Sequence, residues 1–327
     1  MRVIASGITF LVGLAMPLAV AAGEPRRPGQ ENDCQRQQRP VIDFVELQST
    51  LSTPAAPPAA PTQTPLTVKG KLMLPVALEQ RTKCFVARNK LSAVVILHGS
   101  AGVDARGDFY ARALNEAGVA TLEIDMWEAR GMGRSLAARP PHPSYTYRDA
   151  FAALEFLSSY PGIDPARIGV LGFSWGGVMT LAAASSNIVA AFTAGPDAPR
   201  FKAHLAHYPV CYAYNNASIP GSSFGRQAGN PLTGAPILIQ TGSADDYDDG
   251  AAPCLALHAS LGADEKKLMQ VVVYEAAGHA WDRLQVPVTA VDPFAHRGRG
   301  GAVRIVPDVN QAYRSRELAV DFFRRNL

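Results

Sequence analysis

Short apolar runs alternate with helical patterns along the chain from Leu91 onward. Runs rich in Val, Ile and Leu occupy residues 92–100, 119–127, 167–174, 235–243 and 268–275. Segments with a helical period of apolar residues occupy 108–118, 146–160, 175–186, 251–262 and 313–327. Strands that are apolar throughout and alternate with helices predict an α/β fold, with a mostly parallel central sheet covered by helices on both faces. In such sheets, functional residues gather in the loops at the carboxyl ends of the strands.

The length of the chain favours one large domain, and its charge excludes one class of partner. The 327 residues are 47% apolar and 18% charged, and the formal net charge is +3. So small a charge, carried by scattered residues, gives no support for nucleic-acid binding. We expect the domain at residues 66–327, opening with the alternating segment 66–75 as part of an edge hairpin. Arg297 and Arg299 are interpreted as a solvated surface loop.

The first 22 residues have the order of a secretory signal peptide. Arg2 precedes an apolar stretch at 8–20, and small residues follow around the expected cleavage site. The alternative is a membrane anchor, but glycines and a proline interrupt the stretch, and it is shorter than the roughly 20 residues of a membrane span. We predict a periplasmic or secreted protein with no stable membrane span after cleavage. Residues 23–65, polar and then rich in Pro and Ala, are expected to form a tether or surface loop.

Export would place the cysteines where disulfides form and persist. The sequence has four cysteines, Cys34, Cys84, Cys211 and Cys254, which allow three pairings. Their order along the chain favours Cys34 with Cys84 and Cys211 with Cys254. No cysteine has the spacing of a zinc site, so we expect no metal.

One serine stands between glycines at the predicted turn from strand 167–174 into helix 175–186. Residues 172–176 read GFSWG and match the G-x-S-x-G pattern of a nucleophile on a tight turn. Glycines let the strand and the helix approach closely at such a turn. The turn would raise the Ser174 hydroxyl above the sheet and direct the Trp175 amide at a bound carbonyl oxygen. The alternative is a glycine-rich turn whose serine has no chemical role.

A nucleophilic serine needs a base, and the base needs an acid to orient it, in the chain order Ser, Asp or Glu, His. Asp245 follows the run 235–243 in a G-x-x-D pattern, and His279 follows the run 268–275 after a glycine. We predict His279 as the base and Asp245 as its acid, with Asp246 as the alternative acid. Asp248 and Asp249 in the same loop are interpreted as solvated charges.

The loop after the first buried strand is expected to complete the site. His98 and Gly99 end that strand, and Ser100 or Ala101 would supply a second backbone N–H to a bound oxyanion. His98 itself fits an oxyanion-loop or structural role, because it precedes the serine in the chain.

These motifs together resemble those of the dienelactone hydrolase family of α/β-hydrolases. The likeness covers about residues 66–327 and rests on LHGSAG (97–102), EIDMWEARGMGRS (123–135), GFSWGG (172–177), GSADDYDDGAAPC (242–254) and GHAWD (278–282). The resemblance implies the α/β-hydrolase fold, no cofactor, and hydrolysis of lactones or small carboxylic esters. It also implies a pocket lined by Arg130.

By position, the resemblance implies Ser174 as nucleophile, Asp245 as acid, His279 as base, and Trp175 and Ser100 as amide donors. The best-known family members carry a cysteine where this chain has Ser174. A serine must lose its proton during attack, which is the usual esterase arrangement, so a general ester hydrolase is favoured over the specific dienelactone reaction. Two other functions are weighed against it: an exported peptidase of the same fold, and a non-catalytic binding protein on this scaffold.

Overall fold

The computed structural model describes residues 41–53, 62–75, 90–132, 139–193, 195, 197–219 and 222–327. The predicted signal peptide, residues 1–22, lies outside these residues, and so do Cys34 and Cys84. Among the described residues, no helix combines the length and the apolar content that crossing a membrane requires.

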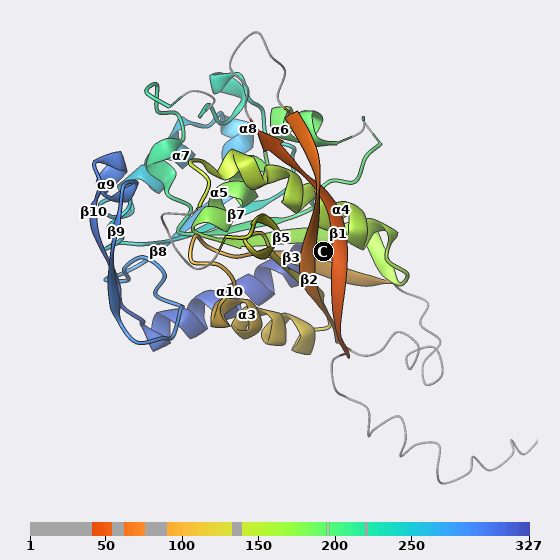
Figure 1. Cartoon of the computed structure of the whole chain (residues 1–327). Helices are drawn as coiled ribbons and strands as arrows, with labels where there is room; N and C mark the ends of the chain where they lie inside the picture. The colour runs from red at the N-terminus through yellow and green to blue at the C-terminus, as the bar shows by residue number, and fades with distance from the viewer. Residues whose placement is uncertain are drawn as a thin grey trace, which may run out of the picture. The chain divides into compact units, whose positions relative to one another are not determined.

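In the described part of the chain, one sheet of eight strands has the order β1-β2-β4-β3-β5-β6-β7-β8 (Figure 1). The strands are β1 (Val41–Thr53), β2 (Thr62–Leu74), β3 (Leu91–Leu97), β4 (Ala120–Asp125), β5 (Ile163–Phe173), β6 (His204–His207), β7 (Ile237–Gly242) and β8 (Met269–Tyr274). Strands β3 to β8 pair in parallel, and β2 pairs antiparallel with both β1 and β4. The predicted α/β fold with a mostly parallel sheet is confirmed.

The sheet begins earlier than the sequence indicates. Residues 23–65 were expected to be a tether, but β1 lies within them and pairs with β2 along its whole length. One side of β1 is buried at Leu47 and Ser49, while Ile42 and Phe44 stay exposed. Ser49 also donates a hydrogen bond from Oγ to Asp149 Oδ1 over 2.6 Å. Because β1 is buried on one side only, its sequence lacks the continuous apolar run of the central strands.

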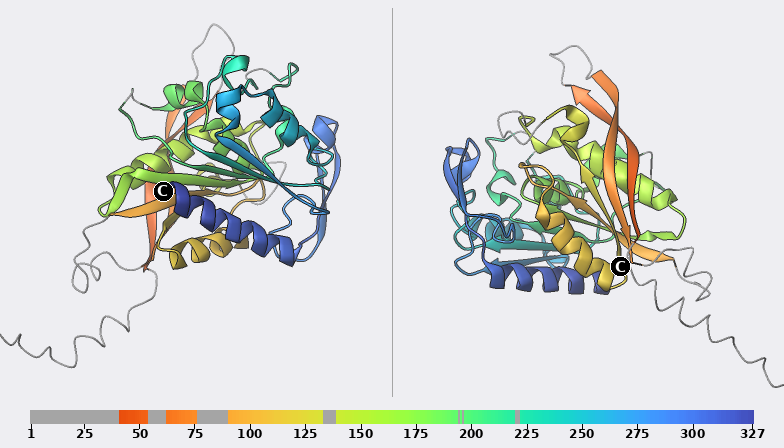
Figure 2. Two further views of the ribbon diagram at one scale, coloured as in Figure 1. Left: turned by 180° about the vertical axis from the view of Figure 1, so that it is seen from behind. Right: turned by 60° about the horizontal axis from the view of Figure 1, so that its bottom comes forward.

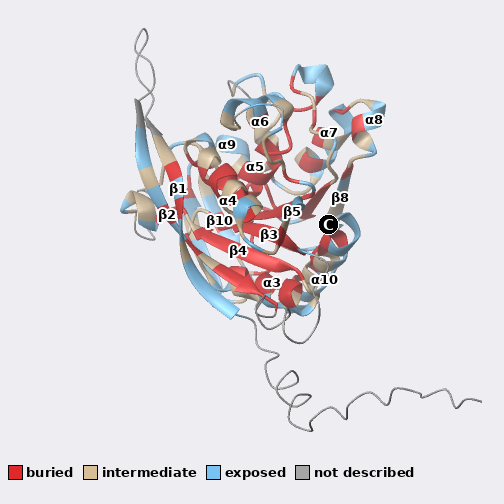
Figure 3. Ribbon diagram, turned by 90° about the vertical axis from the view of Figure 1, so that its right-hand side faces the viewer, coloured by how far each residue is buried: buried red, intermediate tan, exposed pale blue. Residues whose placement is uncertain are grey.

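Helices cover both faces of the sheet (Figures 1 and 2). Helices α3 (Ala105–Glu116) and α10 (Val309–Asn326) contact each other on one face, where they share a core with Tyr110 and Phe323. Helices α4 (Tyr147–Ser159) and α5 (Trp175–Ala182) pack on the other face, with Phe151 and Met179 in their core. The sheet between these layers is largely buried (Figure 3), as the apolar strand pattern predicts.

The remaining helices in the described residues are short. They are α6 (Ser186–Phe192), α7 (Ala252–Ser260), α8 (Ala263–Lys266), α9 (Ala295–Gly298), and the 3-10 turns η1 (Glu128–Arg130), η3 (Pro143–Thr146), η4 (Cys211–Ala213) and η5 (Arg226–Ala228).

A two-stranded hairpin that the sequence did not reveal precedes α10. It consists of β9 (Val288–Asp292) and β10 (Gly301–Ile305), with α9 at its tip. The expected solvated loop lies there, and Arg297 and Arg299 are both exposed, but each also makes a contact. Arg299 forms an ion pair with Asp249, whose nearest atoms are 2.6 Å apart, and Arg297 Nε donates to the Asp248 carbonyl over 3.0 Å. Both guanidinium groups keep some exposure while tying the hairpin to the loop after β7.

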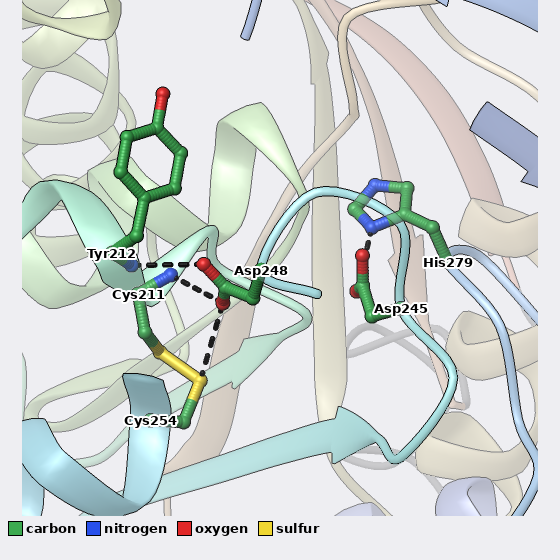
Figure 4. Close-up of a disulfide and its surroundings, with 6 residues drawn as sticks. All are labelled: Cys211, Tyr212, Asp245, Asp248, Cys254 and His279. Atoms are coloured by element: carbon green, nitrogen blue, oxygen red, sulfur yellow. Dashed lines mark hydrogen bonds and ion pairs between the residues drawn. A yellow bond between two sulfur atoms is a disulfide. The ribbon is translucent and has the colours of Figure 1, made fainter. Parts of the chain in front are cut away.

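The structure contains one of the two expected disulfides among its described residues. Cys211 and Cys254 are joined, which links η4 to α7 across 43 positions of sequence (Figure 4). Both residues are buried. Since Tyr212 and Ala213 follow directly after Cys211, the bond fixes a turn beside the carboxyl ends of the strands.

The double substitution of Cys211 and Cys254 by serine should lower the free energy of unfolding by about 2–4 kcal/mol. Without the disulfide, the unfolded chain regains the conformational entropy that closure of a long loop removes. Urea unfolding of wild type and of the double variant, which leaves Cys34 and Cys84 unchanged, measures the loss. Equal stability of the two proteins would show that this bond does not constrain the unfolded chain.

Candidate active site

Ser174 is the single residue between β5 and α5, and its backbone has φ 51° and ψ −107°. A positive φ is uncommon for serine, and the surrounding backbone holds it there. The Ser174 amide donates to the His207 carbonyl over 3.0 Å. A Cβ atom added at Gly172 would lie 2.0 Å from the Gly176 oxygen, and one at Gly176 would lie 2.2 Å from the Leu97 oxygen. Both glycines are therefore required by close backbone approach.

Three predicted residues meet at the carboxyl ends of the strands. His279 Nε2 lies 3.0 Å from Ser174 Oγ, and His279 Nδ1 lies 2.8 Å from Asp245 Oδ2. Figure 4 shows the Asp245 carboxylate directed at the imidazole. All three side chains are buried. With Nδ1–H donating to the carboxylate, the Nε2 lone pair is free to accept the serine proton.

The loops after β7 and β8 bring the acid and the histidine together. A Cβ atom at Gly242 would lie 2.1 Å from the Ala277 oxygen, so only glycine fits where the two loops touch. The second oxygen of Asp245 accepts from the Tyr247 amide over 2.8 Å. Asp246, the alternative acid, points elsewhere: its Oδ2 accepts from the Arg304 amide over 2.9 Å. The geometry therefore pairs Asp245, not Asp246, with His279.

The two residues predicted to supply backbone N–H groups, Trp175 and Ser100, line the same cavity as Ser174. Trp175 is the first residue of α5, so its amide has no acceptor within the helix. Ser100 lies in the turn after β3, and its carbonyl accepts from Trp127 Nε1 over 3.0 Å. Ser100, Ser174 and Trp175 all line the cavity, which is the arrangement expected of two oxyanion donors.

His98 has a structural role beneath this turn. Its Nδ1 donates to the Gly99 carbonyl over 2.7 Å, and its Nε2 accepts from the Met126 amide over 3.0 Å. Burial lowers the pKa of His98 to about 4, so the ring stays neutral and can make both bonds at once. His98 thereby fixes the position of the Ser100 turn.

The cavity beside Ser174 has a volume of about 180 Å³ and mainly apolar walls. Besides the three residues already named, its described lining consists of Arg139, His142, Pro143, Val178, Val210, Tyr212, Ala213, Ile219, Tyr247 and Phe294. Arg130, which the resemblance placed in the pocket wall, is absent from this described lining. Its guanidinium instead forms an ion pair with Asp149, with 2.7 Å between the nearest atoms, and donates to the Met126 carbonyl over 2.9 Å.

Asp248 is buried, whereas the sequence suggested a solvated charge. Its carboxylate accepts from the Cys211 amide over 2.7 Å and from the Tyr212 amide over 2.8 Å (Figure 4). Burial, reinforced by the charge of Asp245, raises the pKa of Asp248 to about 7. Asp248 and the disulfide together fix the turn that places Tyr212 in the cavity wall. Because both sulfur atoms are bonded to each other, the cluster of Cys211, Asp248 and Cys254 offers no thiolate to a metal.

Sequence reasoning also missed Arg139 and Asp292. Arg139 lies in the cavity wall and binds Asp292, which stands 153 positions later at the end of β9. No local pattern connects residues so far apart. Tyr247 joins them through its hydroxyl, which donates to Asp292 Oδ2 over 2.9 Å.

The strand order, with a serine at the turn from β5 into α5, defines the protein as having the α/β-hydrolase fold. The sequence profile of the dienelactone hydrolase family matches residues 83–325. The chain belongs to the dienelactone hydrolase family.

Solved structures with the same fold include P91, a dienelactone hydrolase-like promiscuous phosphotriesterase from metagenomic libraries. It is 17% identical, with 87% of this chain and 98% of that chain covered and a TM-score of 0.53. Esterase 2 of Thermogutta terrifontis is 16% identical, with 79% and 89% covered and a TM-score of 0.52. A candidate dipeptidyl aminopeptidase IV from Bacteroides ovatus is 19% identical, with 89% of this chain but 36% of that chain covered and a TM-score of 0.52. At these identities the likeness concerns the fold.

Proposed function

We propose that the protein is an exported serine hydrolase that cleaves small carboxylic esters or lactones through an acyl-enzyme. The observation that carries the proposal is the chain of contacts from Ser174 Oγ through His279 to Asp245 beside a mainly apolar cavity. Membership of the dienelactone hydrolase family supports hydrolysis.

In the proposed reaction, Ser174 Oγ attacks the ester carbonyl while His279 Nε2 takes its proton. Asp245 stabilises the imidazolium that forms, and the amides of Trp175 and Ser100 donate to the developing oxyanion. His279 then gives the proton to the leaving alcohol. Water, activated by the same histidine, attacks the acyl-enzyme and releases the acid.

Export and the domain limits belong to the same proposal. We assign residues 1–22 to a removed signal peptide and a periplasmic or secreted location to the remainder. The Cys211–Cys254 disulfide supports an oxidising compartment. The hydrolase domain is proposed to start at β1, because that strand completes the sheet.

The cavity favours short acyl groups. Drug-sized ligands occupy pockets of roughly 300–1,000 Å³, and this cavity measures about 180 Å³. Val178, Val210, Ile219 and Phe294 are among the residues that line it beside Ser174. Acetyl to butyryl groups would fit without displacing these side chains, whereas longer chains would have to extend toward solvent.

Hydrolysis of p-nitrophenyl esters from acetate to octanoate, together with a simple lactone, tests the proposal. We expect turnover that Ser174→Ala abolishes and that is fastest for the short acyl chains. A fluorophosphonate probe should label the wild type and not the Ser174→Ala variant. Folded wild type that neither turns over an ester nor takes the probe would contradict the proposal and favour a binding protein.

A peptidase is the second candidate, because the Bacteroides ovatus protein shares the fold. The match covers 36% of that chain, so much of that protein has no counterpart in the alignment. Aminoacyl and dipeptidyl p-nitroanilides belong in the same assay, and faster turnover of these than of any ester would favour the peptidase.

A further inference from the structure

A buried ion pair forms part of the cavity wall beside Ser174. Arg139 lines the cavity, and its Nη1 and Nη2 lie 2.7 Å from Asp292 Oδ2 and Oδ1 respectively. The two side chains are 7% and 0% exposed. In this bidentate ion pair, Asp292 occupies the two N–H donors with which the Arg139 guanidinium would otherwise bind a carboxylate ligand.

Other contacts hold the pair in this geometry. Asp292 Oδ1 accepts from the Phe294 amide over 2.8 Å, and Oδ2 accepts from the Tyr247 hydroxyl over 2.9 Å. The guanidinium carbon of Arg139 lies 5.0 Å from the Phe294 ring centre and 6.0 Å from that of Trp175. Burial would raise the pKa of Asp292, but the hydrogen bonds from Arg139 and Phe294 outweigh it and hold the pKa below its ordinary value. Asp292 is therefore ionised and cancels the charge of Arg139.

No other described residue of the lining brings a positive charge to the cavity. Burial lowers the pKa of His142, which keeps that ring neutral near pH 7. Behind His279, Asp245 adds a negative charge. An anionic group entering the cavity would lose its hydration and find no unpaired cation among the described lining residues, which is strongly unfavourable.

We propose that the Arg139–Asp292 pair restricts the enzyme to esters whose groups inside the cavity are uncharged, and that Asp292 determines this specificity by occupying Arg139. This inference rests on the proposed ester hydrolysis. It makes Asp292 a specificity residue for that site, since without its carboxylate the guanidinium would face the substrate as a free cation.

Matched substrates that differ only in charge test the inference. Monomethyl succinate and methyl succinamate differ on the acyl side, and 4-acetoxybenzoate and 4-acetoxybenzamide differ on the alcohol side. We expect wild type to show a kcat/KM at least about tenfold higher for the neutral member of one or both pairs. A factor of about ten corresponds to the free energy of one hydrogen bond to a charged group, which the anion would lack in the cavity. Equal kcat/KM for charged and neutral members of both pairs would overturn the inference, and this result needs no variant.

Asp292→Asn should raise the ratio of anionic to neutral kcat/KM by at least about tenfold, because Arg139 is released. The double variant Asp292→Asn with Arg139→Gln should lose that gain. Glu155→Gln, which breaks the Arg148–Glu155 ion pair outside the described lining of the cavity, should keep the wild-type ratio. A folded Asp292→Asn protein with an unchanged ratio would contradict the inference. If no ester in the set shows turnover that depends on Ser174, the proposed function itself fails instead.

Discussion

His279→Ala should lower kcat/KM for the best ester by about 10⁴- to 10⁶-fold, the range measured when a base or nucleophile of such a triad is removed. A serine hydroxyl is a weak nucleophile at neutral pH, and His279 Nε2, 3.0 Å from Ser174 Oγ, is placed to take its proton. Steady-state kinetics with p-nitrophenyl butyrate measure the loss, and circular dichroism checks that the variant is folded.

His258→Ala is the matched control for this variant. His258 lies on α7, and its ring contacts the Lys266 carbonyl. We expect nearly wild-type kinetics from it. Near-normal turnover by folded His279→Ala, with Ser174 still required, would remove His279 as the base and direct the search to another proton acceptor.

Asp245→Asn should lower kcat by about 10³- to 10⁴-fold, because an amide can donate to His279 Nδ1 and favour the wrong tautomer. Asp245 Oδ2 is 2.8 Å from that nitrogen. Asp246→Asn is the natural comparison, since Asp246 is adjacent in sequence and contacts Arg304 on the β9–β10 hairpin. We expect it to cost less than tenfold.

The ranking of these two variants is the informative result. Both substitutions have the same size and chemistry, so differences in folding are minimised. A larger loss in Asp246→Asn than in Asp245→Asn would move the acid by one residue. Similar small losses in both would mean that neither carboxylate orients the histidine.

The loop DDYDDG shows how far sequence reasoning reaches. Its four acidic residues look alike in the sequence, and only the G-x-x-D spacing favours the first. In the structure each has a different partner: Asp245 contacts His279, Asp246 contacts Arg304, Asp248 accepts from the Cys211 and Tyr212 amides, and Asp249 pairs with Arg299. Those partners come from three distant parts of the chain: the loop after β8, the β9–β10 hairpin and η4. Local pattern could therefore select one candidate acid, but could not show that Asp248 is buried.

The fold was predictable where the strands are buried on both faces. All residues of β3 and β7 are buried, and their apolar runs are continuous in the sequence. The edges of the fold were harder. Strand β1 has one exposed side, and β9 is exposed at most of its positions, so neither carries a strong apolar period. Their pairing depends on contacts with segments elsewhere in the chain, which a single sequence does not display.

The backbone of Ser174 has a consequence for how this protein could evolve. Its φ of 51° with ψ of −107° costs about 1–3 kcal/mol in a residue other than glycine, and the rest of the domain must offset that cost. Selection for stability alone would favour glycine at this position, whereas selection for turnover keeps the serine. At the nucleophile turn, selection for stability and selection for activity therefore oppose each other. The sheet around Ser174 must be packed well enough to offset the strain of this backbone conformation.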